Sequence, residues 1–151
     1  MVSYKIFIFI MMVLLHILED FHLQGILANM KQRDWWYKEY CKERHLGEGW
    51  STCKYKKDYV VCLIMHSLEN SIFIMLPIII DGVITILTVN PNNSYFIMWI
   101  GFIFINTILH ALIDNAKCNG RSINLITDQA MHFVIMAILF AESWKYLGAW
   151  R

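Results

Sequence analysis

The sequence has almost no excess of charge, no Gly-rich phosphate loop and no close pair of cysteines. Its 13 Lys and Arg offset 12 Asp and Glu to a formal net charge of +1, and such a chain has no positive field with which to hold nucleic acid. We therefore exclude nucleic acid as a partner. The four cysteines form neither a Cys-x-x-Cys pair nor a dense framework, so we predict reduced thiols at Cys41, Cys53, Cys62 and Cys118.

Apolar residues, in contrast, are abundant. They make up 58% of the 151 residues, and aromatic residues make up 15%, whereas a soluble globular domain is roughly 45–50% apolar. This excess indicates that lipid is the solvent. A spanning helix needs about 20 largely apolar residues to cross about 30 Å of hydrocarbon, so the chain has room for four. The predicted fold is an all-α, four-helix transmembrane bundle in a single domain, residues 1–151.

Four apolar stretches are long enough to be the spans. The first follows one Lys, as in a signal peptide, but no small-residue cleavage site follows it, so we interpret it as a retained span. The second contains Pro77, which should kink or tilt one long helix, because residues 78–89 alone would reach only about 18 Å. The predicted spans are about 3–30, 59–89, 95–116 and 123–147.

The connection at about residues 31–58 is richer in aromatic and charged residues than a simple loop requires. Trp35, Trp36 and Tyr40, next to Lys and Arg, suit the lipid head-group region. This composition allows a short interfacial helix between spans one and two. The segment could serve as a lid over a site, as a lipid contact or as a partner site.

The distribution of Lys and Arg predicts the orientation. Ten of these residues lie in or next to the connections after spans one and three, and the opposite end has only Lys5, Lys145 and Arg151. Positive residues near span ends are retained in the cytoplasm. We therefore predict an integral protein of a bacterial inner membrane with both termini outside the cytoplasm and residues 31–58 inside it.

Polar side chains recur at helical spacing near one end of every span. In the first span, His16, Asp20 and Gln24 are each four residues apart and share one stripe of the helix. The other spans carry comparable sets, which are His66 and Asn70, then His110, Asp114 and Lys117, then Asp128, Gln129 and His132. A helix rises about 1.5 Å per residue. When residues are counted from the same membrane boundary, the four polar sets lie at similar depths in the membrane.

Several ionisable groups at one depth in a membrane need compensation, because each costs roughly 2.5–3.5 kcal/mol on insertion scales. A cation would provide it, and imidazole with carboxylate suits zinc or manganese. We predict one or two divalent ions near the cytoplasmic face. The predicted ligands are His16, Asp20, His66, His110, Asp114, Asp128 and His132.

Other polar residues of these stripes receive supporting roles. Amides and ammonium groups are poor metal donors, so Gln24, Gln129 and Lys117 are candidates for orienting ligands or for catalysis. Lys117, with Arg121 just beyond it, could hold an anionic group of a substrate. A single His–Asp pair at this spacing is more often a structural contact than a ligand pair, and only the whole set favours metal.

The motifs HILEDFHLQ, MHSLEN, HALIDNAK and DQAMH, in this order, resemble the bacterial and phage membrane-protein family called domain of unknown function 3307. The resemblance covers about residues 10–145 and implies four spans. It falls on the seven predicted ligands and on Phe21, Gln24, Lys117 and Gln129, and it implies no activity. Glu19 and His22 depart from the pattern, and we expect them to face water.

These features favour a membrane-embedded metal-binding protein. The leading hypothesis is a metal-dependent hydrolase that acts on a phosphorylated or lipid-linked substrate at the cytoplasmic leaflet, since two close ions can activate water and neutralise a phosphoryl oxygen. One alternative is an ion or proton relay that moves its cargo across the membrane. Another is a phage-type membrane interaction protein without enzymatic activity.

Overall fold

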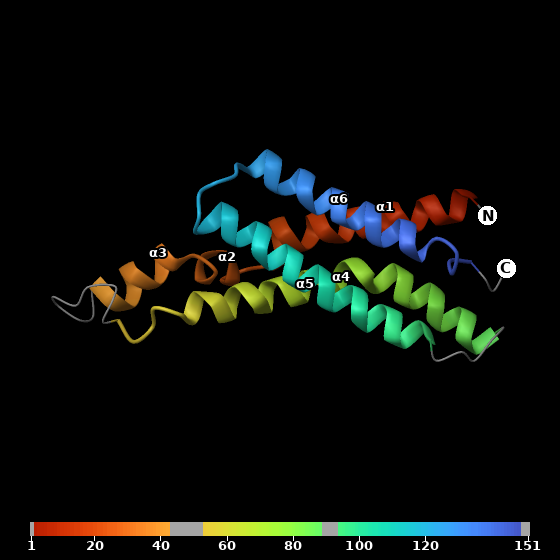
Figure 1. Ribbon diagram of the computed structural model, residues 1–151, viewed down its shortest axis with the longest axis horizontal. Coiled ribbons are helices and arrows are strands. Elements are labelled where there is room, and N and C mark those ends of the chain that lie inside the picture. The colour runs from red at the N-terminus through yellow and green to blue at the C-terminus, as the bar shows by residue number, and fades with distance from the viewer. Residues whose placement is uncertain (1, 43–52, 89–93, 149–151) are drawn as a thin grey trace.

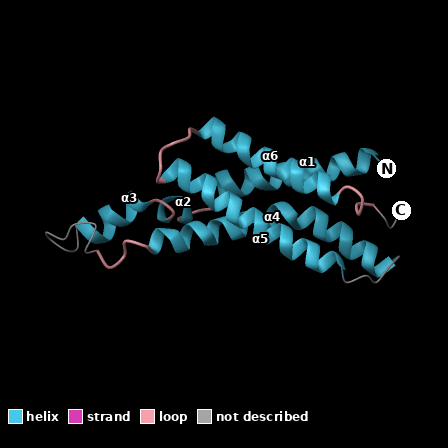
Figure 2. Ribbon diagram, viewed as in Figure 1, coloured by secondary structure: helices cyan, strands magenta, loops and turns pink. Residues whose placement is uncertain are grey.

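Four long helices run side by side in the computed structural model, which describes residues 2–42, 53–88 and 94–148 (Figures 1 and 2). They are α1 (Val2–Leu18) continued by the π-turn η1 (Glu19–Leu23), then α4 (Asp58–Thr88), α5 (Ser94–Cys118) and α6 (Leu125–Ser143). The described residues contain helices and no strand. The predicted all-α bundle is confirmed.

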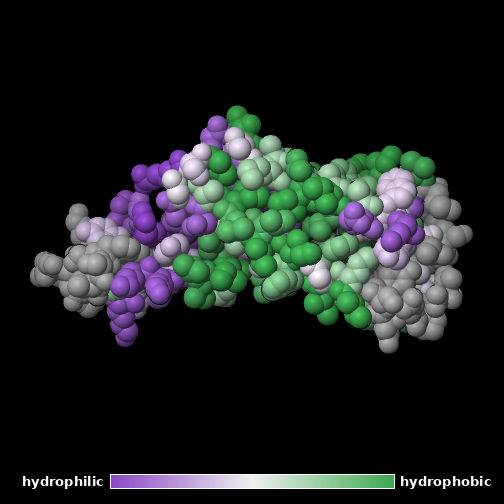
Figure 3. Space-filling model, viewed as in Figure 1, coloured by the Kyte–Doolittle hydropathy of each residue, from purple (hydrophilic) through white to green (hydrophobic). Residues whose placement is uncertain are grey.

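All four long helices have the length and composition of membrane spans. Their outer faces carry large apolar side chains, such as Ile97, Phe104 and Ile126, which are 76%, 65% and 81% exposed. Hydrophobic residues cover the middle of the molecule and hydrophilic residues gather toward both ends (Figure 3). Burying such a surface in lipid removes the cost that water would impose on it, so the chain is an integral membrane protein.

The second span is one helix, as predicted. α4 is 31 residues long and includes Pro77, which corresponds to about 46 Å of helix at 1.5 Å per residue. This length exceeds the hydrocarbon thickness of about 30 Å. α4 therefore has to tilt or to extend beyond the hydrocarbon at one end.

The first span ends earlier than the predicted boundary at residue 30. The helix stops after η1, and Gly25 takes a left-handed conformation with φ of +51°, which is readily available to glycine alone. A separate short helix, α2 (Leu27–Met30), then packs against α4. Gly25 thus redirects the chain where apolar composition alone predicted a longer span.

The described part of the predicted interfacial segment forms short helical turns, α3 (Arg33–Trp36) and the π-turn η2 (Tyr37–Lys42). Three aromatic rings pack together here, with centroids 5.1 Å apart for Trp36–Tyr40 and 5.2 Å apart for Tyr40–Tyr55. Residues 43–52, which belong to the same predicted segment, lie outside the described residues.

A disulfide joins Cys41 and Cys53 beside these rings, so the prediction of four reduced thiols was wrong for this pair. Cys62 and Cys118 are free. A separation of twelve residues matches no Cys-x-x-Cys pair or dense cysteine framework, so the spacing did not indicate this pairing. Disulfides persist in oxidising compartments, whereas the Lys and Arg distribution predicts a cytoplasmic position for the same segment.

An apolar layer separates the two ends of the bundle interior. It consists of Met12, Ile74, Met75, Ile78 and Met136, each at most 2% exposed. Beyond it, at the end where both termini lie, Asp81 accepts hydrogen bonds from the Tyr4 hydroxyl at 2.7 Å and from the Gly148 N–H at 3.0 Å. These bonds tie the first helix and the C-terminal turn to α4.

Close packing of α4 against α5 depends on a glycine. A Cβ atom at Gly82 would overlap the ring of Trp99, which is only 4% exposed. Gly101, on α5, has nothing within 4 Å of the position that a Cβ would take. The two glycines therefore differ in packing although both are helical.

We expect Gly82→Ala to destabilise the bundle by about 1–3 kcal/mol, because overpacking a close-packed core displaces side chains and backbone. Thermal unfolding in mild detergent, followed by circular dichroism, measures this change. Gly101→Ala is the matched control and should change the melting temperature little. Equal melting temperatures for the two variants would contradict the packing described here.

Candidate metal centre

Each spanning helix contributes to one buried cluster, here named the polar centre. It lies at the end of the bundle where α2 and the α5–α6 turn are found, on the far side of the apolar layer from Asp81. Its members are at most 5% exposed, and they are His16, Glu19, Asp20, His66, Asn70, His110, Asp114, Asp128 and His132. All seven predicted ligands are among them.

The π-turn η1 shapes the contribution of the first span. The Gln24 N–H donates to the Glu19 carbonyl at 3.1 Å, a bond that spans five residues instead of four. Glu19 and Asp20 both point into the bundle from this turn and are 0% and 5% exposed. Single π-turns within helices are frequent at functional sites, and this one delivers two adjacent carboxylates.

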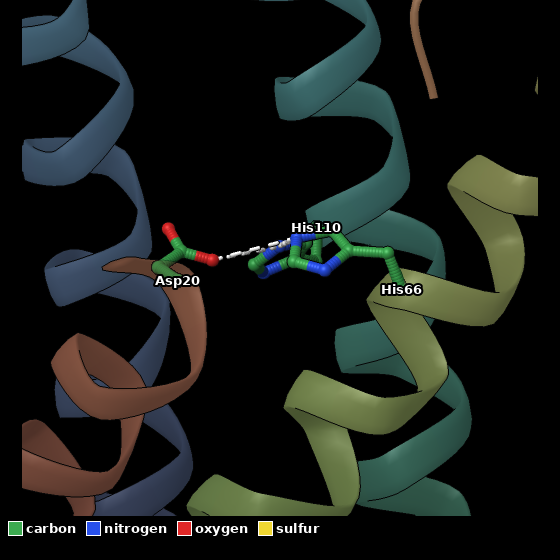
Figure 4. A group of neighbouring side chains, drawn as sticks. All are labelled: Asp20, His66 and His110. Carbon is green, nitrogen blue, oxygen red and sulfur yellow. Dashed lines mark hydrogen bonds and ion pairs between the residues drawn. The ribbon is translucent and has the colours of Figure 1, made fainter. Parts of the chain in front are cut away.

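Three side chains from three helical segments, Asp20, His66 and His110, bring their ligand atoms within 4.8 Å of one another, and Asp114 lies beside the two imidazoles. His66 Nε2 lies 3.3 Å from His110 Nε2, 3.4 Å from Asp20 Oδ1 and 3.3 Å from Asp114 Oδ2. His110 Nε2 lies 3.8 Å from the same Asp20 oxygen and 3.9 Å from the same Asp114 oxygen. Figure 4 shows Asp20 directed at the two imidazole rings. Ligands held about 2.1 Å from a tetrahedral zinc are separated by about 3.4 Å, close to these distances.

A second group lies on the other side of Asp114. His132 Nε2 is 3.6 Å from Asp114 Oδ1 and 3.6 Å from Asp128 Oδ1. Among the described residues these three buried atoms have no hydrogen-bond partner. His110 also belongs to this group, since its ligand atom lies within 4.8 Å of those of Asp114 and His132. The two oxygens of Asp114 thus face two neighbouring sites that could each hold an ion.

Glu19 and Asn70 support the first group from outside. Glu19 Oε1 lies 3.1 Å from His66 Nδ1, and Asn70 Nδ2 donates to Glu19 Oε2 at 2.6 Å. A carboxylate on one ring nitrogen fixes the tautomer and directs the other nitrogen to a metal. Glu19 was expected to face water, and that prediction was wrong. Its burial could have been predicted from sequence, because position 19 is three residues after His16 and lies on the same helix face.

His16 occupies a different position from the other imidazoles. Its Nδ1 lies 3.1 Å from Asn70 Nδ2, and its Nε2 lies 3.3 Å from Gln129 Oε1. Both ring nitrogens therefore have an amide group as their nearest polar neighbour, and the Asp20 Oδ2 carboxylate oxygen is farther from Nε2, at 3.8 Å. The ring packs against His132 with centroids 5.3 Å apart, which places His16 beside the two candidate ion sites, outside both groups of converging ligand atoms.

Two lysines neutralise carboxylates of the centre. The Lys31 ammonium donates to Asp114 Oδ2 at 2.6 Å, and the Lys117 ammonium donates to Asp128 Oδ2 at 2.5 Å. Lys31 is 4% exposed and was not singled out from sequence. It lies outside the long helices, just after α2, so no helical spacing connects it with Asp114.

The two predicted glutamines lie at the edge of the centre. Gln129 Nε2 donates to Asp20 Oδ2 at 3.0 Å and to Asp128 Oδ2 at 3.1 Å. The Gln24 side chain donates to the Asp20 backbone carbonyl. Gln129 thus contacts two carboxylates of the centre, Gln24 contacts the backbone, and the roles expected of both stay predictions.

Two further basic or titratable residues lie away from the centre. Arg121 is exposed and pairs with Asp34 at 2.6 Å, so it does not approach the cluster. His22 is exposed, as expected.

The buried charges do not cancel within the described residues. The four carboxylates are Glu19, Asp20, Asp114 and Asp128, and only Lys31 and Lys117 oppose them within the centre. Two negative charges therefore remain when the imidazoles are neutral. Uncompensated charge in a membrane interior is costly, and one divalent cation or two protonated imidazoles would offset it.

Comparisons with protein-family models, with curated proteins and with solved structures found no match for this chain. The resemblance to domain of unknown function 3307 stays a prediction.

We expect Glu19→Gln to weaken zinc affinity about 10–100-fold, the usual effect of losing a carboxylate that orients a ligating His. Competition between purified protein and a chromophoric chelator measures the affinity. Glu69→Gln is the control, because Glu69 is partly exposed on α4 and faces an apolar groove with Leu27 and Phe73. A Glu19 variant with wild-type zinc affinity would contradict the orienting role.

Proposed function

We propose that this chain is a membrane-embedded, metal-dependent hydrolase that acts on a phosphorylated or lipid-linked substrate. The observation that carries the proposal is the presence of two buried groups of ligand atoms, Asp20 with His66 and His110, and His110 with Asp114 and His132, each with its atoms within 4.8 Å of one another. Buried polar atoms normally have partners. Asp114 Oδ1 and His132 Nε2 have no hydrogen-bond partner in the described part of the chain, and a divalent ion in the second group would satisfy both.

Two ions are proposed, with Asp114 between them. The first would take Asp20, His66 and His110, with Asp114 Oδ2 3.3 Å from His66 Nε2. The second would take His110, Asp114 and His132, with Asp128 Oδ1 3.6 Å from His132 Nε2. Zinc or manganese suits this mixture of nitrogen and carboxylate oxygen. Of the seven predicted ligands, His16 is reassigned to a positioning role because both its nitrogens face amides.

Hydrolysis is favoured over transport by the apolar layer. A relay needs polar groups on both sides of the membrane and a route between them. Asp81 is a buried polar group on the far side, so the apolar layer argues against transport only by interrupting the route. Between the polar centre and the apolar layer, the buried side chains of Ser71 and Asn106 form one further hydrogen bond, in which Asn106 donates to Ser71 at 2.8 Å. Met75 and Met136, at most 1% exposed, then close the interior. A centre closed on one side suits chemistry that begins and ends at one leaflet.

A pair of divalent ions supplies an activated water and neutralises charge on a phosphoryl oxygen. The residues of this chain would hold that pair, exclude lipid and orient the substrate. In hydrolysis the oxygen of water forms a bond to phosphorus, the ester P–O bond breaks, and the leaving oxygen takes a proton. Gln24, Gln129 and Lys117 line the pocket next to the centre, where a substrate would meet these groups.

Elemental analysis of protein purified in mild detergent tests the metal. We expect up to two equivalents of zinc or manganese in the wild type, and at least one equivalent lost in His110→Ala and in Asp128→Ala, because each variant removes a ligand. His22→Ala is the control, since His22 is exposed on the same π-turn.

Wild-type protein that stays free of metal after incubation with zinc and with manganese would refute the hydrolase. It would favour the alternative in which two protonated imidazoles offset the buried carboxylates.

We also propose that the polar centre lies at the cytoplasmic leaflet, with both termini outside. The support is the excess of Lys and Arg at the α2 end of the bundle. Alkaline phosphatase fused to the C-terminus should then be active in a bacterial host, and green fluorescent protein fused there should be dark. The reverse result would place the Cys41–Cys53 disulfide and the centre on the oxidising side.

A further inference from the structure

A pocket of about 230 Å³ lies directly beside the polar centre. Its polar lining consists of Asp20, Gln24, Lys31, Gln32, Lys117 and Gln129, and Phe21 and Leu125 add apolar surface. Drug-sized ligands occupy pockets of about 300–1,000 Å³, so this pocket has the size of a small head group. Asp20 lines it and also belongs to the first group of ligands, which joins pocket and centre.

Among the described residues, the two lysines of the pocket form ion pairs with carboxylates of the polar centre. Lys31 pairs with Asp114, and Lys117 pairs with Asp128 and, at 3.7 Å, with Asp114. Bound cations would draw these carboxylates toward themselves and weaken both lysine pairs. The two ammonium groups would then face the pocket with reduced compensation, and an ammonium that is nearly buried needs a counter-charge.

The charge of the loaded centre indicates which anion would enter. Four carboxylates and two lysines carry a net charge of −2 with neutral imidazoles, and two divalent ions would change this to +2. A phosphate monoester carries close to two negative charges at neutral pH. A phosphate diester carries one. The monoester therefore restores neutrality, and its terminal oxygens can accept from both lysines and from the glutamine amides.

We propose that Lys31 and Lys117, with Gln24 and Gln129, form a phosphate subsite that selects a phosphate monoester dianion for the metal centre. This inference rests on the proposed hydrolase, since the subsite is complete only when the ions are bound. The monoester could be water-soluble or could be the head group of a lipid such as phosphatidic acid. The shared chemistry is the terminal phosphate.

Titration calorimetry on metal-loaded protein in mild detergent tests the subsite, with methyl phosphate and dimethyl phosphate as probes. We expect methyl phosphate to bind at least tenfold more tightly than dimethyl phosphate. Lys31→Gln and Lys117→Gln should each weaken methyl phosphate binding by about tenfold or more, because each removes a charged hydrogen-bond donor. Arg121→Gln, which removes an exposed cation at the same end of the bundle, should leave the affinity unchanged.

Metal content measured on the same samples separates this inference from the proposed function. Wild-type protein without metal would refute the hydrolase. Wild-type protein with metal that binds neither ester, or binds both equally, would overturn the subsite alone. Lysine variants that lose metal together with phosphate binding would also overturn it, because the lysines would then only stabilise the centre.

The source of the phosphate is distinguished in nanodiscs. Metal-loaded protein is titrated with methyl phosphate in nanodiscs of phosphatidylcholine alone and in nanodiscs containing phosphatidic acid. Loss of methyl phosphate binding in the second set supports the subsite and identifies a lipid monoester as the competing ligand. Unchanged binding supports the subsite and identifies a water-soluble monoester.

Discussion

Burial of four carboxylates inside a membrane bundle is the constraint on which the rest of this structure depends. Asp114 is central to it, because its two oxygens face two groups of imidazole and carboxylate atoms and also accept from Lys31. Lipid on the outside offers no water to relieve the charge. Positive charge from cations, protons or ammonium groups must therefore compensate the carboxylates at their depth in the bundle. Every span contributes a residue to the polar centre.

The parts of this arrangement that follow a helical period were accessible from sequence. Spacings such as His110 to Asp114 and Asp128 to His132 place each pair on one helix face. Equal depth in antiparallel helices then brings the faces together, as the structure does for all seven predicted residues. The same helical spacing places Glu19 on the face of His16. A charged side chain nevertheless predicted exposure to water, because the partners that stabilise it, His66 and Asn70, come from another helix.

Features that depend on tertiary contact were not accessible. Lys31 reaches Asp114 only because Gly25 turns the chain and α2 then packs against α4. The Cys41–Cys53 disulfide likewise joins two parts of the segment between the first two spans, as do the ring contacts from Trp36 to Tyr40 and from Tyr40 to Tyr55. Neither the contact of Lys31 with Asp114 nor the disulfide joins residues at a helical spacing, so composition and residue spacing could not predict them.

The apolar layer of Met12, Ile74, Met75, Ile78 and Met136 has an electrical consequence. A voltage across the membrane acts on charges that move through the low-dielectric interior, by about 2.3 kcal/mol per elementary charge per 100 mV. Water, protons and phosphate that arrive and depart on one side of this layer traverse little of that field. The proposed hydrolysis at the polar centre would then be electrically silent, equally fast in energised and in depolarised membranes.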